Sequence, residues 1–242
     1  MNRLSAAAMA VVFVLAASAA AFASGDFEGI AGSGSIQGQD RAVPAFQAVV
    51  VEGSGTLTVR QGPPGPVHVE TDDNLLPLVR TEVVGGVLHL GFVPDAHVMH
   101  VTRLEFTVSA PTVTALTVAG SGTIQAASPL RGDSLALDIR GSGTIACDAQ
   151  VSSLELGIGG SGRIQTGGTA DHIVVTIEGS GTVKARGLAS TTAEVKISGS
   201  GDAVVFVTRA LDVSINGSGN VRYGGGARTT VHSSGSGSVG AY

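Results

Sequence analysis

Aromatic side chains are scarce in this sequence, which has no tryptophan, two tyrosines and seven phenylalanines. A carbohydrate-binding platform of stacked aromatic rings is therefore not expected. Cysteine is scarcer still, because Cys147 is the only one. No disulfide can form within the chain, so packing and hydrogen bonds must stabilise the fold.

Positive charge is also sparse, because 14 Lys and Arg residues are outnumbered by 19 Asp and Glu residues, which gives a net charge of −5. Nucleic acids and anionic membrane surfaces attract proteins with clustered Lys and Arg side chains. The composition therefore argues against a nucleic-acid partner. No cofactor-binding motif is present, and we expect no cofactor.

The one long apolar run lies at the N-terminus, from about Ala6 to Ala21, after the cation Arg3. The pattern Ala21-Phe22-Ala23 follows it, which is typical of a secretory signal peptide cleaved after Ala23. An uncleaved anchor is the alternative, because a membrane-spanning helix needs about 20 apolar residues. We expect residues 1–23 to be removed. The mature protein is then periplasmic or at the cell surface, and not an integral membrane protein.

Glycine is abundant instead, with 36 residues, and the triplet Gly-Ser-Gly occurs nine times. From Gly120 the triplets recur after 21, 19, 19, 20, 18 and 18 residues, a spacing typical of repeat proteins. Further triplets begin at Gly32, Gly53 and Gly235. Six triplets are predicted to form a structural ladder of corners: Gly120-Ser121-Gly122, Gly141-Ser142-Gly143, Gly160-Ser161-Gly162, Gly179-Ser180-Gly181, Gly199-Ser200-Gly201 and Gly217-Ser218-Gly219.

Alternating apolar residues precede each of these triplets, for example Leu135, Leu137 and Ile139 before Gly141. This is the period of a half-buried strand. Another apolar residue, such as Ile145, follows each triplet at a fixed offset. Each repeat is therefore predicted to contain a strand, a tight corner, a short second strand and a variable return.

Two architectures accommodate this repeat. In a parallel β-helix, coils of about 18–21 residues stack so that each strand pairs with its equivalent. In a meander, prism or barrel, each triplet would instead be a hairpin turn between antiparallel strands. The strand before the triplet is longer than the strand after it, which favours the all-β solenoid.

The corner glycines are expected to supply positive φ angles or close backbone approach, and the serines to form a ladder of hydroxyl groups. A serine nucleophile is the functional alternative. It would need one activated serine beside a base, whereas at least seven equivalent serines lack a histidine at a fixed offset. The structural role is therefore favoured.

Residues 24–111 depart from the simple repeat and are predicted to form an irregular β-rich cap, continuous with a solenoid over residues 112–242. Strands are expected on both sides of Gly53-Ser54-Gly55 and in the stretches PGPVHVET and LEFTVSAP. A turn or short helix is expected from Asp72 to Leu78, and a hairpin across Gly85-Gly86.

At this point the sequence resembles a known family. The stretch GSGTLTVRQGPPGPVHVETDDNLLPLVRTEVVGGVLHL, followed by serial VAGSGTI and RGSGTI units, is similar to bacterial exported domains described as "putative auto-transporter adhesin, head GIN domain". The resemblance extends from about Phe46 to Val239 and is most specific at Asp72-Asp73-Asn74-Leu75-Leu76 and Thr81-Glu82-Val83. It implies an exported, right-handed parallel β-helix with an adhesin-like role, and it supplies no catalytic residues.

The strongest enzymatic alternative is a polysaccharide lyase or hydrolase on a β-helix scaffold. Such sites need clustered carboxylates. Alignment of the repeats on their triplets places Glu155, Glu194 and Asp212 on one outward ladder, with Lys196 two residues along the strand from Glu194. Only Glu194 and Asp212 are adjacent like charges, so a solvated surface with an ion pair is favoured over a catalytic site.

A metal site is not expected either. Asp95, His97 and His100 are potential ligands, but they lack a fourth partner and are typical of a surface loop. Cys147 occupies a position filled by small residues in other repeats, which indicates a buried thiol.

We therefore expect an exported, non-enzymatic β-solenoid that acts as an adhesin-like, binding or structural module of the cell envelope. Its partner would be an unidentified envelope or surface ligand, and a homo-oligomer remains open.

Overall fold

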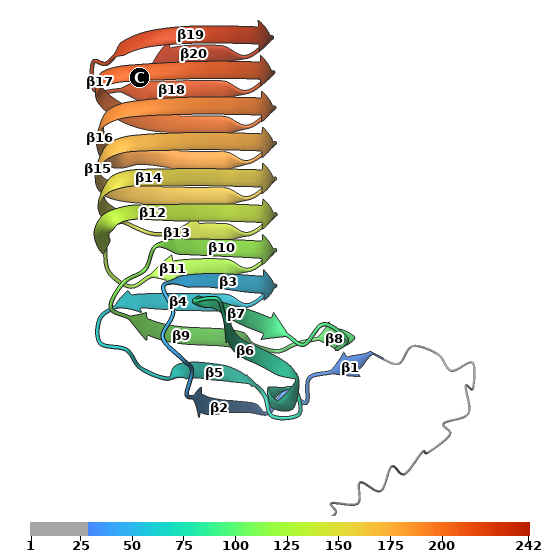
Figure 1. Ribbon diagram of the computed structural model, residues 1–242. Helices are drawn as coiled ribbons and strands as arrows, with labels where there is room; N and C mark the ends of the chain where they lie inside the picture. Colours follow the sequence, from blue (N-terminus) through green and yellow to red (C-terminus); the bar gives the residue numbers. More distant parts are fainter. Residues whose placement is uncertain (1–28) are drawn as a thin grey trace, which may run out of the picture.

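The computed structural model describes residues 29–242 as a column of stacked β-coils with a cap at its N-terminal end (Figure 1). The predicted signal peptide, residues 1–23, lies outside the described residues. The strands of the column beyond the cap are β10 (Ala115–Gly120), β11 (Thr123–Ala126), β12 (Leu130–Gly141), β13 (Thr144–Ala146), β14 (Ala149–Gly160), β15 (Arg163–Gly179), β16 (Thr182–Gly199), β17 (Asp202–Gly217), β18 (Asn220–Gly224), β19 (Arg228–Gly235) and β20 (Ser238–Ala241).

Equivalent strands of successive coils pair in parallel and in register, as Leu137 with Leu156 and Gly141 with Gly160. The molecule is therefore a right-handed parallel β-helix, as the sequence predicts. The hairpin alternative is excluded, because it requires antiparallel neighbours.

Inward-facing residues form continuous apolar stacks, because alternate residues of a strand point to the same face. One stack contains Ile139, Ile158, Ile177, Ile197 and Ile215, each at most 2% exposed. Full burial of such a side chain stabilises a fold by about 1.5–3 kcal/mol. These stacks join one hydrophobic core that extends from Phe46 to Val221.

The first coil begins well before the regular repeats. β3 (Ala48–Gly53) pairs in register with β10, and β4 (Thr56–Gln61) pairs with β11. The Gly53 triplet is therefore a corner of the column, and residues 62–114 are an excursion between the first two coils.

In the cap, strand pairing changes from parallel to antiparallel. β7 (Val87–Phe92) and β9 (Leu104–Ala110) pair in parallel with β3 and β4. β6 (Val79–Val84) then pairs antiparallel with β7 across the expected Gly85-Gly86 hairpin. β5 (Val67–Asp72) pairs antiparallel with β9, and β2 (Ile36–Arg41) with β5. The expected helical turn is the 3-10 helix η1 (Leu76–Leu78).

A two-stranded parallel sheet of β1 (Ile30–Ala31) and β8 (Val98–His100) projects from the cap (Figure 1). Across residues 29–242, no helix has the length and apolar character needed to cross a bilayer.

Candidate binding surface

The predicted corner ladder lies along one edge of the column, with each triplet directly beside the next. Gly120 pairs with Gly141 and Gly141 with Gly160, and the register continues through Gly179, Gly199 and Gly217. Backbone groups hold these corners together, as Ser142 N donates to Gly120 O at 2.9 Å. The corners are therefore a main-chain ladder.

The two glycines of a triplet are needed for different reasons. The first glycine, such as Gly141, has a φ of +132°, which L-residues rarely adopt. The second glycine of the triplet, such as Gly143, does not have a positive φ. It lies against Val118 and Gly122 of the preceding coil. Positive φ therefore explains only one glycine of each pair.

The ladder serines point to solvent. Across the described chain, residues 29–242, none of the six makes a side-chain hydrogen bond. The expected hydroxyl ladder therefore does not form. No base is positioned to activate these hydroxyl groups for nucleophilic attack.

The outward carboxylate ladder has the predicted register. Glu194 lies beside Asp212 on adjacent strands. Lys196 Nζ contacts Glu194 Oε1 at 2.6 Å, and the two side chains are 57% and 40% exposed. These residues form an exposed ion pair on the side of the column, where such pairs contribute little to stability.

The Asp95, His97 and His100 segment serves as backbone support. Ile30 N donates to His97 O at 2.7 Å, and Gly32 N donates to His100 O at 2.8 Å. Within residues 29–242, no group of three or more His, Cys, Asp or Glu side chains could hold a metal ion.

Cys147 is buried, as expected. Burial raises the pKa of its thiol to about 12, and the negative charge of Asp148 makes a smaller contribution in the same direction.

The N-terminal arm, residues 29–41, is held by a clamp of three side chains, Asp72, Asp73 and Asn74. The sequence did not reveal this role. The buried Asp72 carboxylate accepts hydrogen bonds from Gly34 N at 2.7 Å and Thr102 N at 2.9 Å. Burial alone would raise the pKa of Asp72, but hydrogen bonds from the backbone and side chain of Thr102 and from the backbone of Gly34 together outweigh burial and lower this pKa. In the sequence, the Gly-Ser-Gly triplet at Gly32 marks this arm, but it does not show which residues bind the arm.

Asn74 and Asp73 complete the clamp. Asn74 Oδ1 accepts a hydrogen bond from Ser33 N at 3.0 Å, and Asn74 Nδ2 donates to Ala31 O at 2.8 Å. Ser33 Oγ donates to Asp73 Oδ1 at 2.5 Å. The motif Asp72-Asp73-Asn74 therefore holds the arm in place.

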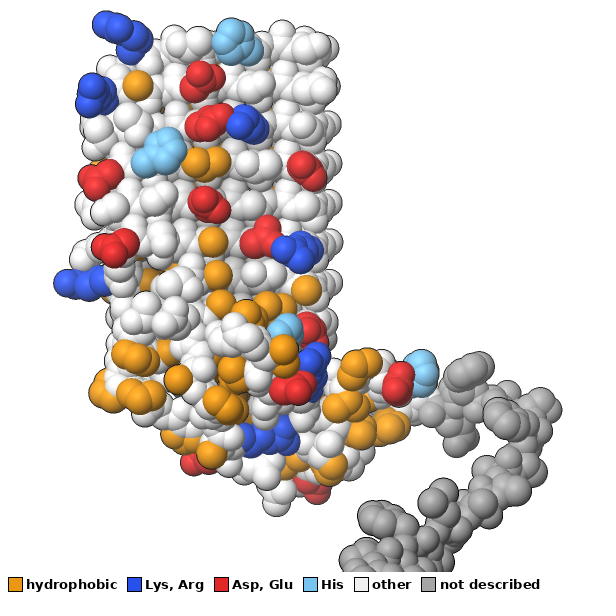
Figure 2. Space-filling view, viewed as in Figure 1, with side chains coloured by type: hydrophobic (Ala, Val, Ile, Leu, Met, Phe, Trp, Pro, Cys, Tyr) orange, Lys and Arg blue, Asp and Glu red, His pale blue; other side chains and the backbone are white. Residues whose placement is uncertain are grey.

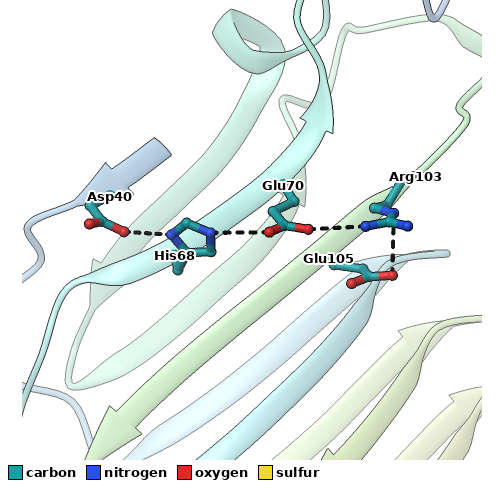
Figure 3. Close-up of polar contacts among 5 residues, drawn as sticks. All are labelled: Asp40, His68, Glu70, Arg103 and Glu105. Atoms are coloured by element: carbon teal, nitrogen blue, oxygen red, sulfur yellow. Dashed lines mark hydrogen bonds and ion pairs between the residues drawn. The ribbon is translucent and has the colours of Figure 1, made fainter. Parts of the chain in front are cut away.

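A chain of charged side chains crosses β2, β5 and β9 (Figure 3). His68 Nδ1 lies 2.6 Å from Asp40 Oδ1, and His68 Nε2 lies 3.4 Å from Glu70 Oε1. Arg103 contacts Glu70 at 3.2 Å and Glu105 at 3.6 Å. The hydrogen bond to Asp40 raises the pKa of His68. The network ties three cap strands together.

An apolar hollow of about 610 Å³ lies where the cap meets the first coils. Two of its polar side chains are used internally, since Thr114 Oγ1 donates to Gln47 O at 3.1 Å and Ser109 Oγ donates to Pro63 O at 2.7 Å. No charged residue lines it. The lining residues are Val43, Pro44, Ala45, Phe46, Gln47, Ala48, Pro64, Gly65, Gly85, Gly86, Val87, Ser109, Ala110, Pro111, Thr112 and Thr114.

On the face shown in Figure 2, hydrophobic side chains gather over the cap and are sparse over the column of coils. A pocket of 300–1,000 Å³ with an apolar lining is the usual form of a site for a small ligand or side chain. The hollow is therefore the candidate binding surface. Sequence reasoning missed it because its walls come from loops that are far apart in the chain.

A protein-family model described as "Putative auto-transporter adhesin, head GIN domain" matches residues 45–227. A crystal structure of a putative adhesin from Bacteroides fragilis NCTC 9343 is 21% identical, with a TM-score of 0.82, and the match covers 88% of this chain and 100% of that chain. A putative adhesin from Parabacteroides distasonis ATCC 8503 is 27% identical, with a TM-score of 0.74, covering 89% and 100%.

A third solved structure, described as a "Putative lipid binding protein" from Parabacteroides distasonis ATCC 8503, is 23% identical, with a TM-score of 0.74, covering 88% of this chain and 99% of that chain. At 21% and 23% identity, the first and third of these likenesses show a shared fold. None of the curated proteins matches the chain.

Proposed function

The chain belongs to the family described as "Putative auto-transporter adhesin, head GIN domain", and we propose that it is an exported, non-enzymatic β-solenoid that binds a ligand of the cell envelope or surface. The solenoid serves as a rigid support in this proposal, since its coils are tied by continuous backbone ladders. Binding takes place at the apolar hollow between the cap region, residues 24–111, and the solenoid, residues 112–242.

The hollow carries this proposal because it offers apolar surface without charge. Its lining includes Val43, Pro44 and Phe46 together with the two prolines Pro64 and Pro111. Proline rings are rigid, so little conformational entropy is lost when a ligand packs on them. An apolar group of an envelope component, such as an aliphatic side chain or an acyl chain, suits this lining.

An acyl chain is a second candidate ligand. The lining has no cation to pair with a phosphate or carboxylate headgroup, so recognition would be limited to the chain itself. The similar solved structure described as a "Putative lipid binding protein" gives a reason to test lipids separately from proteins and glycans.

Ala45→Glu tests the site, because Ala45 is exposed and lines the hollow. Ala189→Glu is the matched control, since Ala189 is an exposed alanine on β16 outside the lining. The purified protein would be incubated with bacterial envelope fragments and, separately, titrated with a fluorescent fatty acid. We expect binding in at least one arm that Ala45→Glu weakens tenfold or more and Ala189→Glu preserves. Equal binding by both variants would contradict the site.

Export is the second part of the proposal and is tested separately. If residues 1–23 are a signal peptide, as we propose, the exported protein begins at Ser24, which intact mass and N-terminal sequencing would detect. Recovery of a protein that still begins at Met1, in the cytoplasmic fraction, would contradict export.

A further inference from the structure

The coil nearest the C-terminus has two unpaired strand edges. Within residues 29–242, β19 pairs with β17 and β20 pairs with β18, and no described strand lies on their other sides. These strands form the end of the column (Figure 1). Every second residue of such an edge directs its N–H and C=O groups away from the sheet.

The opposite end of the column also ends in strands that pair on one side only, β2 with β5 and β6 with β7, but a charged side chain bridges them. There the strands turn antiparallel, and the Arg41 guanidinium on β2 donates to Val79 O at 2.5 Å and Leu76 O at 2.6 Å. These bonds tie β2 to η1 and β6 across the end of the fold. Arg41 therefore links the outer strands at the cap end, whereas β19 and β20 have no such link across the C-terminal end among the described residues.

The C-terminal coil lacks the residues that usually protect an edge. Natural edge strands carry Lys, inward charges, proline or bulges that prevent pairing with another chain. From Arg228 to Ala241 the coil contains no Lys, Asp, Glu or Pro, and its one Arg, Arg228, is the first residue of β19. β19 is in register with β17 along its whole length, without a bulge.

We propose that this end is an interface that binds a second copy of the same chain, end to end about a two-fold axis. Two edges are free, one on each sheet of the column, so a single added strand would satisfy only one of them. A second copy presents the same two edges at the same separation. A two-fold axis perpendicular to the column makes the facing strands antiparallel, an arrangement in which an edge is complementary to itself.

The side chains of β19 suit this pairing. Val231 follows Val213 on the inward face and is 44% exposed. With the two-fold axis at Val231, this residue packs on its own equivalent, and Thr229 faces Ser233 of the second copy. Arg228 faces Ser234 of the second copy, so no like charges lie opposite each other.

The interface is small, because each copy contributes one coil, from Arg228 to Ala241. Standard protein–protein interfaces use roughly 20–30 residues a side. We therefore expect a reversible dimer, with a dissociation constant in the micromolar range or above. This proposal is independent of ligand binding at the hollow.

Sedimentation equilibrium of the purified protein from about 10 µM to about 1 mM covers this range of affinities. We expect a monomer–dimer equilibrium that Val231→Lys weakens at least tenfold. Val84→Lys is the matched control, since Val84 is an exposed valine of the cap, and it should leave the equilibrium unchanged. A monomer at all concentrations, or assembly beyond the dimer, would overturn the proposal.

Val231→Cys tests the geometry with a substitution that conserves size. Facing residues of antiparallel strands have Cα atoms about 4.5–5.5 Å apart, within the range that a disulfide spans. Mild oxidation should give a disulfide-linked dimer of Val231→Cys and none of Val84→Cys. Absence of the Val231→Cys dimer, with the native circular dichroism spectrum retained, would overturn the two-fold arrangement.

Discussion

Gly143 lies so close to Val118 of the preceding coil that a Cβ atom on Gly143 would be 2.5 Å from Val118 Cγ1. The same atom would lie 2.6 Å from Gly122 O. The stacking of coils therefore requires glycine at this corner position, because a side chain would press into the core of the neighbouring coil.

Gly143→Val and Gly162→Val should each destabilise the fold by about 2–3 kcal/mol or more, since an overpacked site must move backbone. A Cβ atom at Gly162 would lie 2.6 Å from Ile139 Cγ2. Ser161→Ala should change stability by less than about 0.5 kcal/mol, because Ser161 is exposed. Urea unfolding compares the three variants, and similar midpoints for all would contradict the steric role.

The register of the coils was predictable from the sequence because each triplet marks the same point in its repeat. Counting back from the triplet places Glu194 beside Asp212 and makes Ile197 an inward residue, and both features are confirmed. The period of two then assigns every strand residue to the core or to solvent.

The cap was predictable only in part. The Gly85-Gly86 hairpin and the strand Leu104–Ala110 have local signals, and both are present. The pairing of β4 with β9 joins segments that no local pattern connects. The candidate binding surface depends on such long-range pairing, so the sequence alone did not locate the hollow.

Asp72→Asn should release the N-terminal arm. Gly34 N donates to one carboxylate oxygen and Thr102 N to the other, and an amide replaces one of these oxygens with an NH₂ group that cannot accept. Hydrogen–deuterium exchange should increase in residues 29–41. Asp133→Asn, at an exposed residue, is the control. Unchanged exchange in the arm of Asp72→Asn would contradict the clamp.

Acid should have the same effect as this substitution. The folded-state pKa of Asp72 is lower than its ordinary value of 3.8. Its contribution to stability is therefore present above that value and is lost as the pH falls through the folded-state pKa. Protection factors of the arm amides in the unmodified protein, which correct for the intrinsic pH dependence of exchange, should fall over this acidic interval.

The Asp40–His68 contact should make the cap slightly more stable in mild acid. The pKa of His68 is higher than its ordinary value of 6.5, chiefly through the hydrogen bond to Asp40. The stabilisation is therefore complete below pH 6.5 and is lost as the pH rises through the folded-state pKa. His68 is 44% exposed, so the effect is small. Melting temperatures from pH 5.5 to 8.5 should fall less for His68→Gln than for the unmodified protein, and parallel profiles would contradict the assignment.

Cys147 should be inert in the folded protein. Burial raises the pKa of its thiol to about 12, so almost no thiolate exists at neutral pH, and reagents cannot reach the sulfur. A thiol-reactive disulfide reagent at pH 8 should label Cys147 only after denaturant unfolds the chain. Stoichiometric labelling within minutes under native conditions would contradict its burial.

We expect no cleavage of neutral or acidic polysaccharides, with or without Ca²⁺. A glycosidase places two carboxyl groups roughly 5 to 10 Å apart on opposite sides of the scissile bond. Glu194 and Asp212 instead lie side by side on the outer face of adjacent strands. A substrate cannot lie between them, and Glu194 is paired with Lys196. Product analysis by mass spectrometry after prolonged incubation tests this prediction. Turnover that disappears in the Glu194→Ala, Asp212→Ala double variant and persists in Glu155→Ala would establish an enzyme and overturn the binding-module proposal.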